Sequence, residues 1–332
     1  MDFGVLQFFS WPGRRVPLEQ VYERALNRIE IMDKTGFDAV WLAEHHFSTY
    51  SVCPSVHMMG MHVAGRTKRL RIGTGVTLAA FYHPLRIAEE VALLDVLSGG
   101  RVNWGAGRGF DFTEFEIFGV PVPESKTRFR EAVEIVLAAW QNERLTWDSK
   151  HWQFKDVEVL PKPAQDPHPP VWVAGSSHDS VSWAGELGHS VMLSPHLPFK
   201  TIDEHQKLFR ASLREHGHND TERQIPVARL LAVADSEDEA AETARRGAEW
   251  IFSTYRNESK NANYQANQTG NKPEVTSVDQ YLDDVAIWGT PEKVTDTLHR
   301  LEEEINLNYL MCAPLSHASF MTFTEKVLPK FV

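Results

Sequence analysis

Cysteine is scarce in this chain of 332 residues, which contains only Cys53 and Cys312. The two cysteines lie far apart and outside any closely spaced pair of the kind that binds zinc, so a disulfide framework and a metal site have no support. A chain without disulfides suits a reducing compartment. We therefore expect a cytoplasmic protein that holds no metal ion.

Long hydrophobic runs and an excess of positive charge are also lacking. No stretch reaches the roughly 18 apolar residues of a membrane span, and the first residues lack the basic and apolar regions of a secretory signal. The chain has 34 Lys and Arg residues against 45 Asp and Glu residues, a formal net charge of −11. Because polyanions repel such a chain, neither nucleic acid nor an anionic membrane is an expected partner.

Apolar residues are plentiful, at 42% of the chain, and they follow two alternating periodicities. Strand-like runs such as residues 37–43 and 170–175 alternate with segments of helical spacing such as residues 18–36 and 84–100. This alternation predicts a parallel sheet covered by helices, either doubly wound or closed. Eight strand–helix units can be counted, which favours a single (β/α)₈ TIM-barrel domain over residues 1–332.

Two segments interrupt the alternation. Residues 141–170 contain short β-like pieces and end in a proline-rich connector, which indicates an insertion packed on the barrel. Residues 256–280 are polar and almost free of aliphatic side chains, so we expect either a passive linker or a mobile lid.

Barrel enzymes place their active sites at the carboxyl ends of the strands. Several of the expected strands end in residues that can bind a ligand or transfer a proton. These groups should face one cavity, and they are Ala43–Phe47, Gly75–Leu78, Gly105–Gly109 and Gly175–Ser177.

The adjacent histidines His45 and His46 admit three interpretations. Imidazole changes its charge near physiological pH, so either ring can act as a general acid or base. A structural histidine bonded to Glu44 or to the backbone is the alternative. A metal site is the third interpretation, but no further ligand follows at a suitable spacing.

Two sequences are suited to holding an anion. GAGRG at residues 105–109 allows close approach to the backbone, and Arg108 can donate to a phosphate or a ring carbonyl. Its glycine spacing is not that of a dinucleotide fingerprint, no helix is expected directly after it, and a structural turn with a surface arginine explains it equally. In the second sequence, Gly175 and Ser176 lie in the turn after a predicted strand, and Ser180 lies at the start of a predicted helix. The N–H groups of that helix end suit phosphate, although ordinary helix capping uses the same residue types.

Several of the tryptophans lie in apolar runs. Trp41, Trp104, Trp172 and Trp183 are therefore expected in the core, given the large area that an indole buries. Trp250 precedes the polar segment 256–280, and we expect it either in the core or beside a ring-binding cavity.

Several stretches, taken in order, resemble the bacterial-luciferase-like flavin-dependent monooxygenases. They are WLAEHHF at residues 41–47, LRIGTGVTLAAFYHPLRIAEEVALLD at 70–95, LSGGRVNWGAGRGF at 97–110, VAGSS at 173–177 and GTPEKV at 289–294. The resemblance covers most of the chain. It implies a barrel that binds reduced FMN at the carboxyl ends of its strands.

This resemblance implies a role for each candidate residue. His45 matches the catalytic histidine of the luciferase catalytic subunit, and Arg108 matches a phosphate-holding position, as does the turn with Gly175, Ser176 and Ser180. The Gly75–Val76 junction matches a cis non-prolyl peptide under the flavin, and residues 256–280 match a mobile loop. The other residues expected near the cofactor are Glu44, Gly107, Ala174 and Trp250.

The resemblance also implies a reaction and partners. Reduced FMN from a separate NAD(P)H:flavin reductase would react with O₂ to give a flavin C4a-peroxide, which oxygenates a small organic substrate. The apolar helices expected at residues 54–65 and 84–97 would form a homodimer interface. Two alternatives remain: a deazaflavin-dependent oxidoreductase of the same superfamily, and a non-catalytic scaffold subunit.

Overall fold

The computed structural model describes residues 1–220, 223–253 and 275–332. The chain divides into two compact units, whose boundaries fall just after the first strand, inside helix α1 (Leu18–Asp33) and inside two strands of the main sheet. The first unit comprises Met1–Phe8, Asn27–Trp41 and Val173–Val332, and the second unit comprises Phe9–Leu26 and Leu42–Trp172.

The main sheet has the strand order of a closed barrel. Its strands pair in the order β11-β10-β12-β1-β2-β3-β5-β8-β9, and β9 pairs again with β10. The fold is therefore a (β/α)₈ barrel, as the sequence predicts. The strands are β1 (Asp2–Gln7), β2 (Ala39–Leu42), β3 (Arg71–Thr74), β4 (Thr77–Leu78, which pairs with β5), β5 (Val102–Gly107), β8 (Val171–Gly175), β9 (Ser190–Leu193), β10 (Pro226–Val233), β11 (Ile287–Gly289) and β12 (Tyr309–Pro314).

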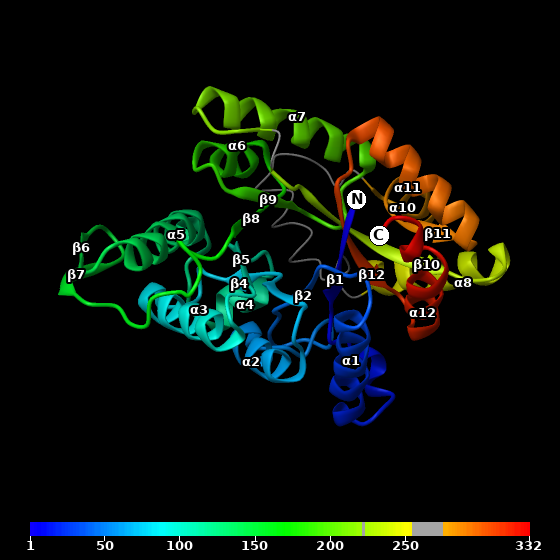
Figure 1. The fold of residues 1–332 in the computed structure, drawn as a ribbon, viewed down its shortest axis with the longest axis horizontal. Helices are drawn as coiled ribbons and strands as arrows, with labels where there is room; N and C mark the ends of the chain where they lie inside the picture. The colour runs from blue at the N-terminus through cyan, green and yellow to red at the C-terminus, as the bar shows by residue number, and fades with distance from the viewer. Residues whose placement is uncertain (221–222, 254–274) are drawn as a thin grey trace. The chain divides into compact units, whose positions relative to one another are not determined.

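Strands of the first unit are buried on both faces. Every residue of β10 is buried, and β10 pairs in parallel with β12 in a register that places Arg229 opposite Cys312. Continuous apolar runs of this kind are what a parallel sheet covered by helices requires. The helices of this unit are α6 (His178–Glu186), α7 (Phe199–Glu215), α8 (Glu237–Ile251), α10 (Val278–Asp284), α11 (Pro291–Ile305) and α12 (His317–Lys326), and Figure 1 shows α8, α11 and α12 beside β10, β11 and β12.

The same capping chemistry starts most of these helices. Ser177, Ser236, Ser277, Thr290 and Ser316 each precede a helix, and each side chain accepts a hydrogen bond from the backbone N–H three residues later. Such a cap satisfies one of the free N–H groups of the first turn. The helix boundaries of the first unit therefore follow local sequence signals.

Arg229 is a fully buried cation in β10. Its Nη1 donates to the carbonyl of Ala228 at 2.8 Å, its Nη2 donates to the carbonyl of Leu197 at 2.8 Å, and Phe199 lies against its guanidinium, 4.6 Å from the ring centroid. Burial lowers the pKa of Arg229 to about 10, which leaves the group charged at neutral pH. Carbonyl dipoles, not a carboxylate, thus stabilise this charge among the described residues.

The second unit is organised by the residues of the LLDVLSGGR stretch. Helices α2 (Val56–Arg66), α3 (Pro84–Ser98), α4 (Phe112–Ile117) and α5 (Ser125–Gln141) belong to this unit. Asp95, at the end of α3, is fully buried and accepts hydrogen bonds from the backbone N–H groups of Ala164 and Gln165, each at 2.9 Å. Arg101 donates to the carbonyls of Ala64, Thr67, Leu70 and Ser98. These two charged residues therefore hold together backbone segments of this unit.

The insertion predicted at residues 141–170 contains an antiparallel hairpin of β6 (Leu145–Asp148) and β7 (Gln153–Val157). Of the predicted lid at 256–280, residues 256–274 lie outside the described residues. The boundary at residue 280 is wrong, because Val275 is buried and α10 begins at Val278 after the cap Ser277. A local capping signal ends the polar segment earlier than its composition indicates.

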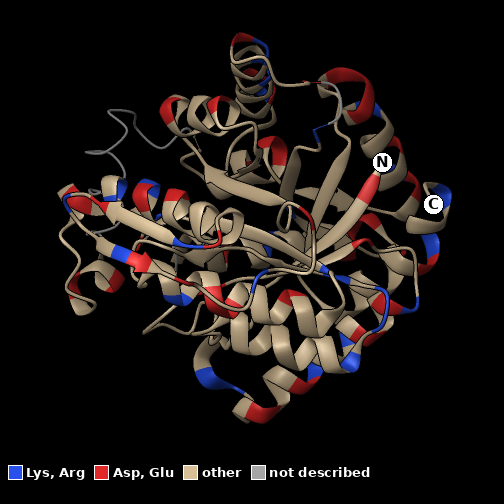
Figure 2. Ribbon diagram, turned by 60° about the vertical axis from the view of Figure 1, so that its left-hand side comes forward, with Lys and Arg blue, Asp and Glu red and all other residues tan. Residues whose placement is uncertain are grey.

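The burial of the tryptophans agrees with the sequence analysis at four of the five positions named there. Trp41, Trp104, Trp172 and Trp183 are buried, whereas Trp250 is only partly buried, so a core position for it is wrong. Both cysteines are unpaired and buried. Figure 2 shows acidic and basic residues interspersed on the helices. In the described parts of the chain, no helix has both the length and the apolar character needed to cross a membrane.

Candidate active site

The segment after β2 places His45 against a buried carboxylate. The Nδ1 atom of His45 lies 3.4 Å from Oε1 of Glu114, and the backbone N–H of His46 donates to the same oxygen at 2.9 Å. Glu114 comes from α4 and is 0% exposed. A carboxylate that accepts from the ring fixes the orientation of an imidazole.

Glu44 and His46 form a second pair directly beside the first. Oε1 of Glu44 lies 3.1 Å from Nε2 of His46 and accepts a hydrogen bond from the hydroxyl of Tyr82 at 2.8 Å. Glu44 is 2% exposed, and its negative charge adds to burial in raising the pKa of Tyr82. His46 is therefore the structural histidine bonded to Glu44, and His45 is the candidate for proton transfer.

Aromatic rings enclose His45. The Tyr50 ring centroid lies 4.8 Å from that of His45, and the Phe110 ring centroid lies 5.6 Å from it, both in edge-on geometry. The backbone N–H of His45 donates to the carbonyl of Cys53 at 3.3 Å, which fixes the start of the loop. The imidazole thus lies in surroundings from which rings exclude much of the water.

Small residues and a half-buried arginine lie at the ends of β3 and β5. The Gly75–Val76 peptide bond is cis, as the resemblance predicts, and the Gly75 N–H donates to the carbonyl of Leu42 at 2.7 Å. Gly107 is buried at the end of β5, and Arg108 follows it half-buried. Contrary to expectation, a short helix begins soon afterwards, because Asp111 caps α4. This helix is what brings Glu114 to His45.

The turn after β8 is both a helix cap and a candidate anion site. The N-cap residue is Ser177, and the hydroxyl of Ser180 donates to its carbonyl at 2.9 Å and accepts from its N–H at 3.2 Å. A Cβ atom on Gly175 would lie 3.1 Å from the Ser180 hydroxyl, so a larger residue would disturb this cap. The capping interpretation is therefore confirmed for Ser177 and Ser180, and Ser176 keeps an exposed hydroxyl without a hydrogen bond to the described residues.

The predicted site residues fall into two groups. Glu44, His45, Gly75, Val76, Gly107 and Arg108 belong to the second unit, whereas Ala174, Gly175, Ser176, Ser180 and Trp250 belong to the first. Among the described residues, no group of three or more His, Cys, Asp or Glu side chains could hold a metal ion. The sequence interpretation missed Glu114, Tyr82, Tyr50 and Phe110. The second acidic residue of FDFTEF, just after GAGRG, was the one available signal for Glu114.

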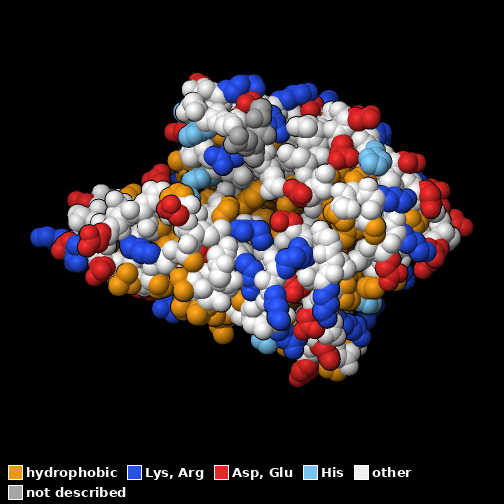
Figure 3. All heavy atoms as spheres, in the orientation of Figure 1, with side chains coloured by type: hydrophobic (Ala, Val, Ile, Leu, Met, Phe, Trp, Pro, Cys, Tyr) orange, Lys and Arg blue, Asp and Glu red, His pale blue; other side chains and the backbone are white. Residues whose placement is uncertain are grey.

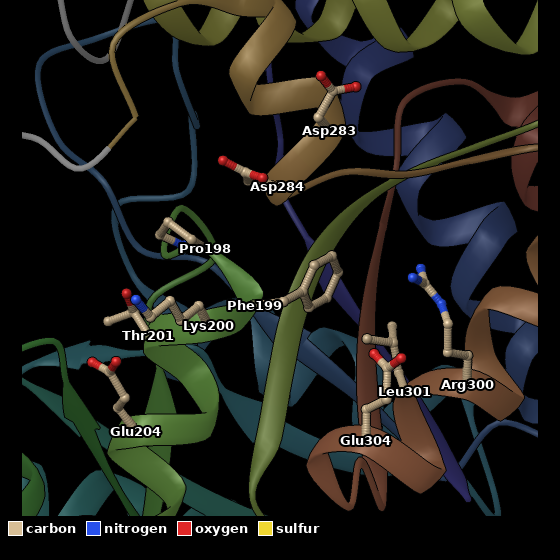
Figure 4. Close-up of a pocket in the computed structure, with 10 residues that line it drawn as sticks. All are labelled: Pro198, Phe199, Lys200, Thr201, Glu204, Asp283, Asp284, Arg300, Leu301 and Glu304. Carbon is tan, nitrogen blue, oxygen red and sulfur yellow. The ribbon is translucent and has the colours of Figure 1, made fainter.

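Pockets lie in both units. A pocket of about 550 Å³ in the second unit is lined by His45 and His46. A pocket of about 520 Å³ in the first unit lies among the N-terminal turn of α7 and the C-terminal ends of α10 and α11 (Figure 4). None of the predicted site residues lines the second of these, whose charged side chains are mostly acidic: Lys200, Glu204, Asp283, Asp284, Arg300 and Glu304.

Known proteins similar to this chain include several oxygenases. The oxygenase component of the flavin-dependent trigonelline monooxygenase of Acinetobacter baylyi is 31% identical over 226 residues, which are 67% of this chain and 62% of that protein. The alkanal monooxygenase alpha chain of Aliivibrio fischeri is 27% identical over 224 residues, 68% of this chain and 63% of that protein. The chain therefore spans less than two thirds of the length of either relative.

Solved structures of the same fold include different enzyme classes. Monooxygenase RslO1 from Streptomyces bottropensis superposes with a TM-score of 0.84 at 28% identity, over 100% of both chains. An F420-dependent secondary alcohol dehydrogenase superposes with a TM-score of 0.79 at 19% identity, over 99% of this chain and 98% of that one, a likeness of fold alone. The model of the luciferase-like monooxygenase family matches residues 1–305. This chain, a (β/α)₈ barrel with a buried Glu114 beside His45, belongs to the luciferase-like monooxygenase family.

Proposed function

We propose that this chain is a flavin-dependent monooxygenase that uses reduced FMN and O₂ to oxygenate a small organic substrate. The observation that carries the proposal is His45, which lies against the buried carboxylate of Glu114 and among aromatic rings. The relative from Acinetobacter baylyi is named as an oxygenase component. By analogy, a separate NAD(P)H:flavin reductase would supply the reduced FMN.

The donors at the strand ends fit a phosphate-bearing cofactor. Ser176 has an exposed hydroxyl at the start of α6, where backbone N–H groups and the helix dipole favour an anion. Arg108 would add a charge-assisted contact. We assign the phosphate of FMN to these residues, with Glu44, Gly75, Val76, Gly107, Ala174, Gly175, Ser180 and Trp250 near the cofactor. The reduced flavin, when bound, supplies the electrons that activate O₂.

His45 would then manage protons in a water-poor cavity. Its Nδ1 faces Glu114, so we assign proton transfer to the opposite ring nitrogen, Nε2. The Tyr50 and Phe110 rings would keep water from the reacting atoms. Glu114 would act as a positioning residue, because it touches the imidazole and not the substrate.

A reconstituted assay separates this function from its alternatives. Purified protein, a flavin reductase, NADH and a panel of aldehydes, ketones and sulfur compounds should give oxygenated product with FMN. Binding of a deazaflavin in place of FMN would favour the hydride-transfer alternative. A chain that binds neither cofactor would favour a scaffold subunit.

Arg108→Ala is expected to weaken the binding of reduced FMN by about 1.5–3 kcal/mol, because a charge-assisted contact to phosphate is lost. Anaerobic titration at several salt concentrations measures this, and the deficit should shrink as salt screens the wild-type contact. Arg144→Ala is the matched control, since Arg144 pairs with Asp156 in the exposed hairpin. Equal affinity of the Arg108 variant and the wild type would remove Arg108 from the site.

We also propose that the chain forms a homodimer through α2 and α3. Large apolar side chains are exposed on these helices: Met58 is 77% and Leu97 is 59% exposed, and Leu93 and Val96 of α3 are also exposed. Figure 3 shows hydrophobic side chains over this part of the surface. Exposed apolar groups of this kind mark an interface more often than a solvated face.

Light scattering at micromolar concentration is expected to give the mass of a dimer. Leu97→Glu should shift the protein towards monomer, because an unpaired carboxylate would be buried in the interface. Leu160→Glu is the control, since Leu160 is similarly exposed but lies in the proline-rich connector. A wild-type monomer would contradict this assembly.

We place the enzyme in the cytoplasm, where unpaired cysteines such as Cys53 and Cys312 persist.

A further inference from the structure

The pocket beside His45 has the size and position of a small-molecule site. Its volume of about 550 Å³ falls within the roughly 300–1,000 Å³ typical of ligand pockets. It lies entirely in the second unit, where the loop after β1 and the loop after β2 meet. Its lining includes Trp11, Arg14, Tyr22, His45, His46 and Phe47.

The two loops are held together by backbone hydrogen bonds. The N–H of Trp11 donates to the carbonyl of Thr49, and the N–H of Val52 donates to the carbonyl of Phe9, each at 2.9 Å. Ser51 adds to this connection, because its hydroxyl accepts from the Phe9 N–H at 3.2 Å. The pocket is therefore built by fixed backbone and is preorganised for a ligand.

Aromatic side chains form the walls, and their polar atoms are already occupied. Nε1 of Trp11 donates to the carbonyl of Val16 at 2.7 Å, and the Tyr22 hydroxyl donates to the carbonyl of Val52 at 2.7 Å. Each ring is thereby fixed in orientation and offers only its apolar surface to the pocket. Phe47, which is mostly exposed, completes the apolar wall. Flat aromatic surfaces favour stacking with another ring.

A single full charge lines this pocket. The guanidinium of Arg14 lies 5.5 Å from the Trp11 ring centroid, and Arg14 makes no ion pair with any carboxylate in the described ranges. No Asp or Glu is among the lining residues, in a chain whose net charge is −11. Glu44 and Glu114, the carboxylates that contact His46 and His45, are almost fully buried. The pocket therefore favours an anionic group at Arg14.

We propose that this pocket is the substrate subsite, and that it takes a planar aromatic or heteroaromatic molecule carrying an anionic substituent such as a carboxylate. The ring packs against Trp11, Tyr22 and Phe47, the anionic group pairs with Arg14, and the opposite edge of the ring points to His45. The role of the pocket as a substrate subsite rests on the proposed function. The preference of the pocket for an anionic aromatic ligand does not depend on the flavin.

Calorimetry on the flavin-free protein tests the preference with a matched ligand pair, 2-naphthoate and its neutral amide, 2-naphthamide. The wild type should bind 2-naphthoate at least about tenfold more tightly than 2-naphthamide, because only the former pairs with Arg14. Arg14→Gln should remove this difference, while Arg14→Lys should keep part of it. Arg15→Gln is the matched control, since Arg15 is the adjacent arginine and does not line the pocket. It should leave both dissociation constants within about twofold of the wild type.

A second variant tests the aromatic wall. Trp11→Leu should weaken the binding of 2-naphthoate and of 2-naphthamide to a similar extent, because both ligands lose the same stacking surface. Circular dichroism on each variant confirms that the fold is retained. Equal binding of the two ligands by the wild type, binding of 2-naphthoate that Arg14→Gln leaves unchanged, or no binding of either ligand would each overturn the proposal.

The same preparations separate this inference from the proposed function. Titration with reduced FMN and the coupled assay with reductase and NADH are run alongside. If reduced FMN binds and aldehydes are oxygenated but 2-naphthoate does not bind, the subsite is refuted and the proposed function stands. If 2-naphthoate binds with the Arg14 dependence described and reduced FMN does not bind, the anion pocket stands and the monooxygenase function fails.

Discussion

His45→Ala is expected to lower the turnover of the reconstituted enzyme about 10²–10⁴-fold, because a positioned imidazole is lost from the proton-transfer step. The variant should still fold and bind reduced FMN, since His45 is only partly buried and makes a long contact of 3.4 Å with Glu114. Stopped-flow assays of product formation, together with flavin titration, measure both quantities. His299→Ala is the matched control, because His299 is an exposed histidine that pairs with Glu302 on α11.

The neighbouring carboxylate sharpens this test. Glu114→Gln keeps an oxygen that can accept from the backbone N–H of His46 but removes the negative charge beside the imidazole. We therefore expect kcat to fall with little change in KM, because the imidazole is less firmly oriented for proton transfer. A His45 variant with full activity would reduce the EHHF sequence to a structural role.

Of the variants proposed, Arg229→Ala should have the largest effect on stability. We expect it to lower the free energy of unfolding by about 3–5 kcal/mol. The substitution leaves a cavity in the first unit and removes the donors that satisfy the carbonyls of Ala228, Pro195 and Leu197. Urea denaturation monitored by circular dichroism provides the measurement. Arg229→Met is the comparison, because it fills much of the volume without the charge and isolates the cost of the lost hydrogen bonds.

Arg245→Ala serves as the surface control, since Arg245 pairs with Asp279 in solvent and such pairs contribute little. If Arg229→Ala is as stable as this control, the three carbonyls must find water or other donors. The loop between β9 and α7 would then be held by its own packing, and Arg229 would be a tolerated charge and not a structural one.

Local sequence signals predicted the fold well. The helical spacing of residues 84–100 corresponds to α3, and the β-rich run 37–43 contains β2. Strand ends also were predictable, because glycines and serines mark where β5 and β8 give way to loops. Such signals act within a few residues, so a single sequence contains them.

Contacts over long separations were not predictable in the same way. Glu114 meets His45 across 69 residues of sequence, and that pairing depends on the barrel bringing two strand ends together. Ser180 shows a different limit, because a capping box and a phosphate cradle use the same residue types. The single-domain assignment and the residues assigned to the cofactor stay predictions.

Chemical labelling of the two buried cysteines can measure how often each unit of the protein opens. Cys53 lies in the second unit and Cys312 in the first, and burial raises the pKa of both thiols, to about 12 for Cys53. A protonated, enclosed thiol does not react with maleimide, so labelling occurs only when the surrounding structure opens. Mass spectrometry of peptides containing either cysteine then gives two separate opening rates. A ligand that binds to the loops beside Cys53 would slow the labelling of Cys53 and leave the labelling rate of Cys312 unchanged.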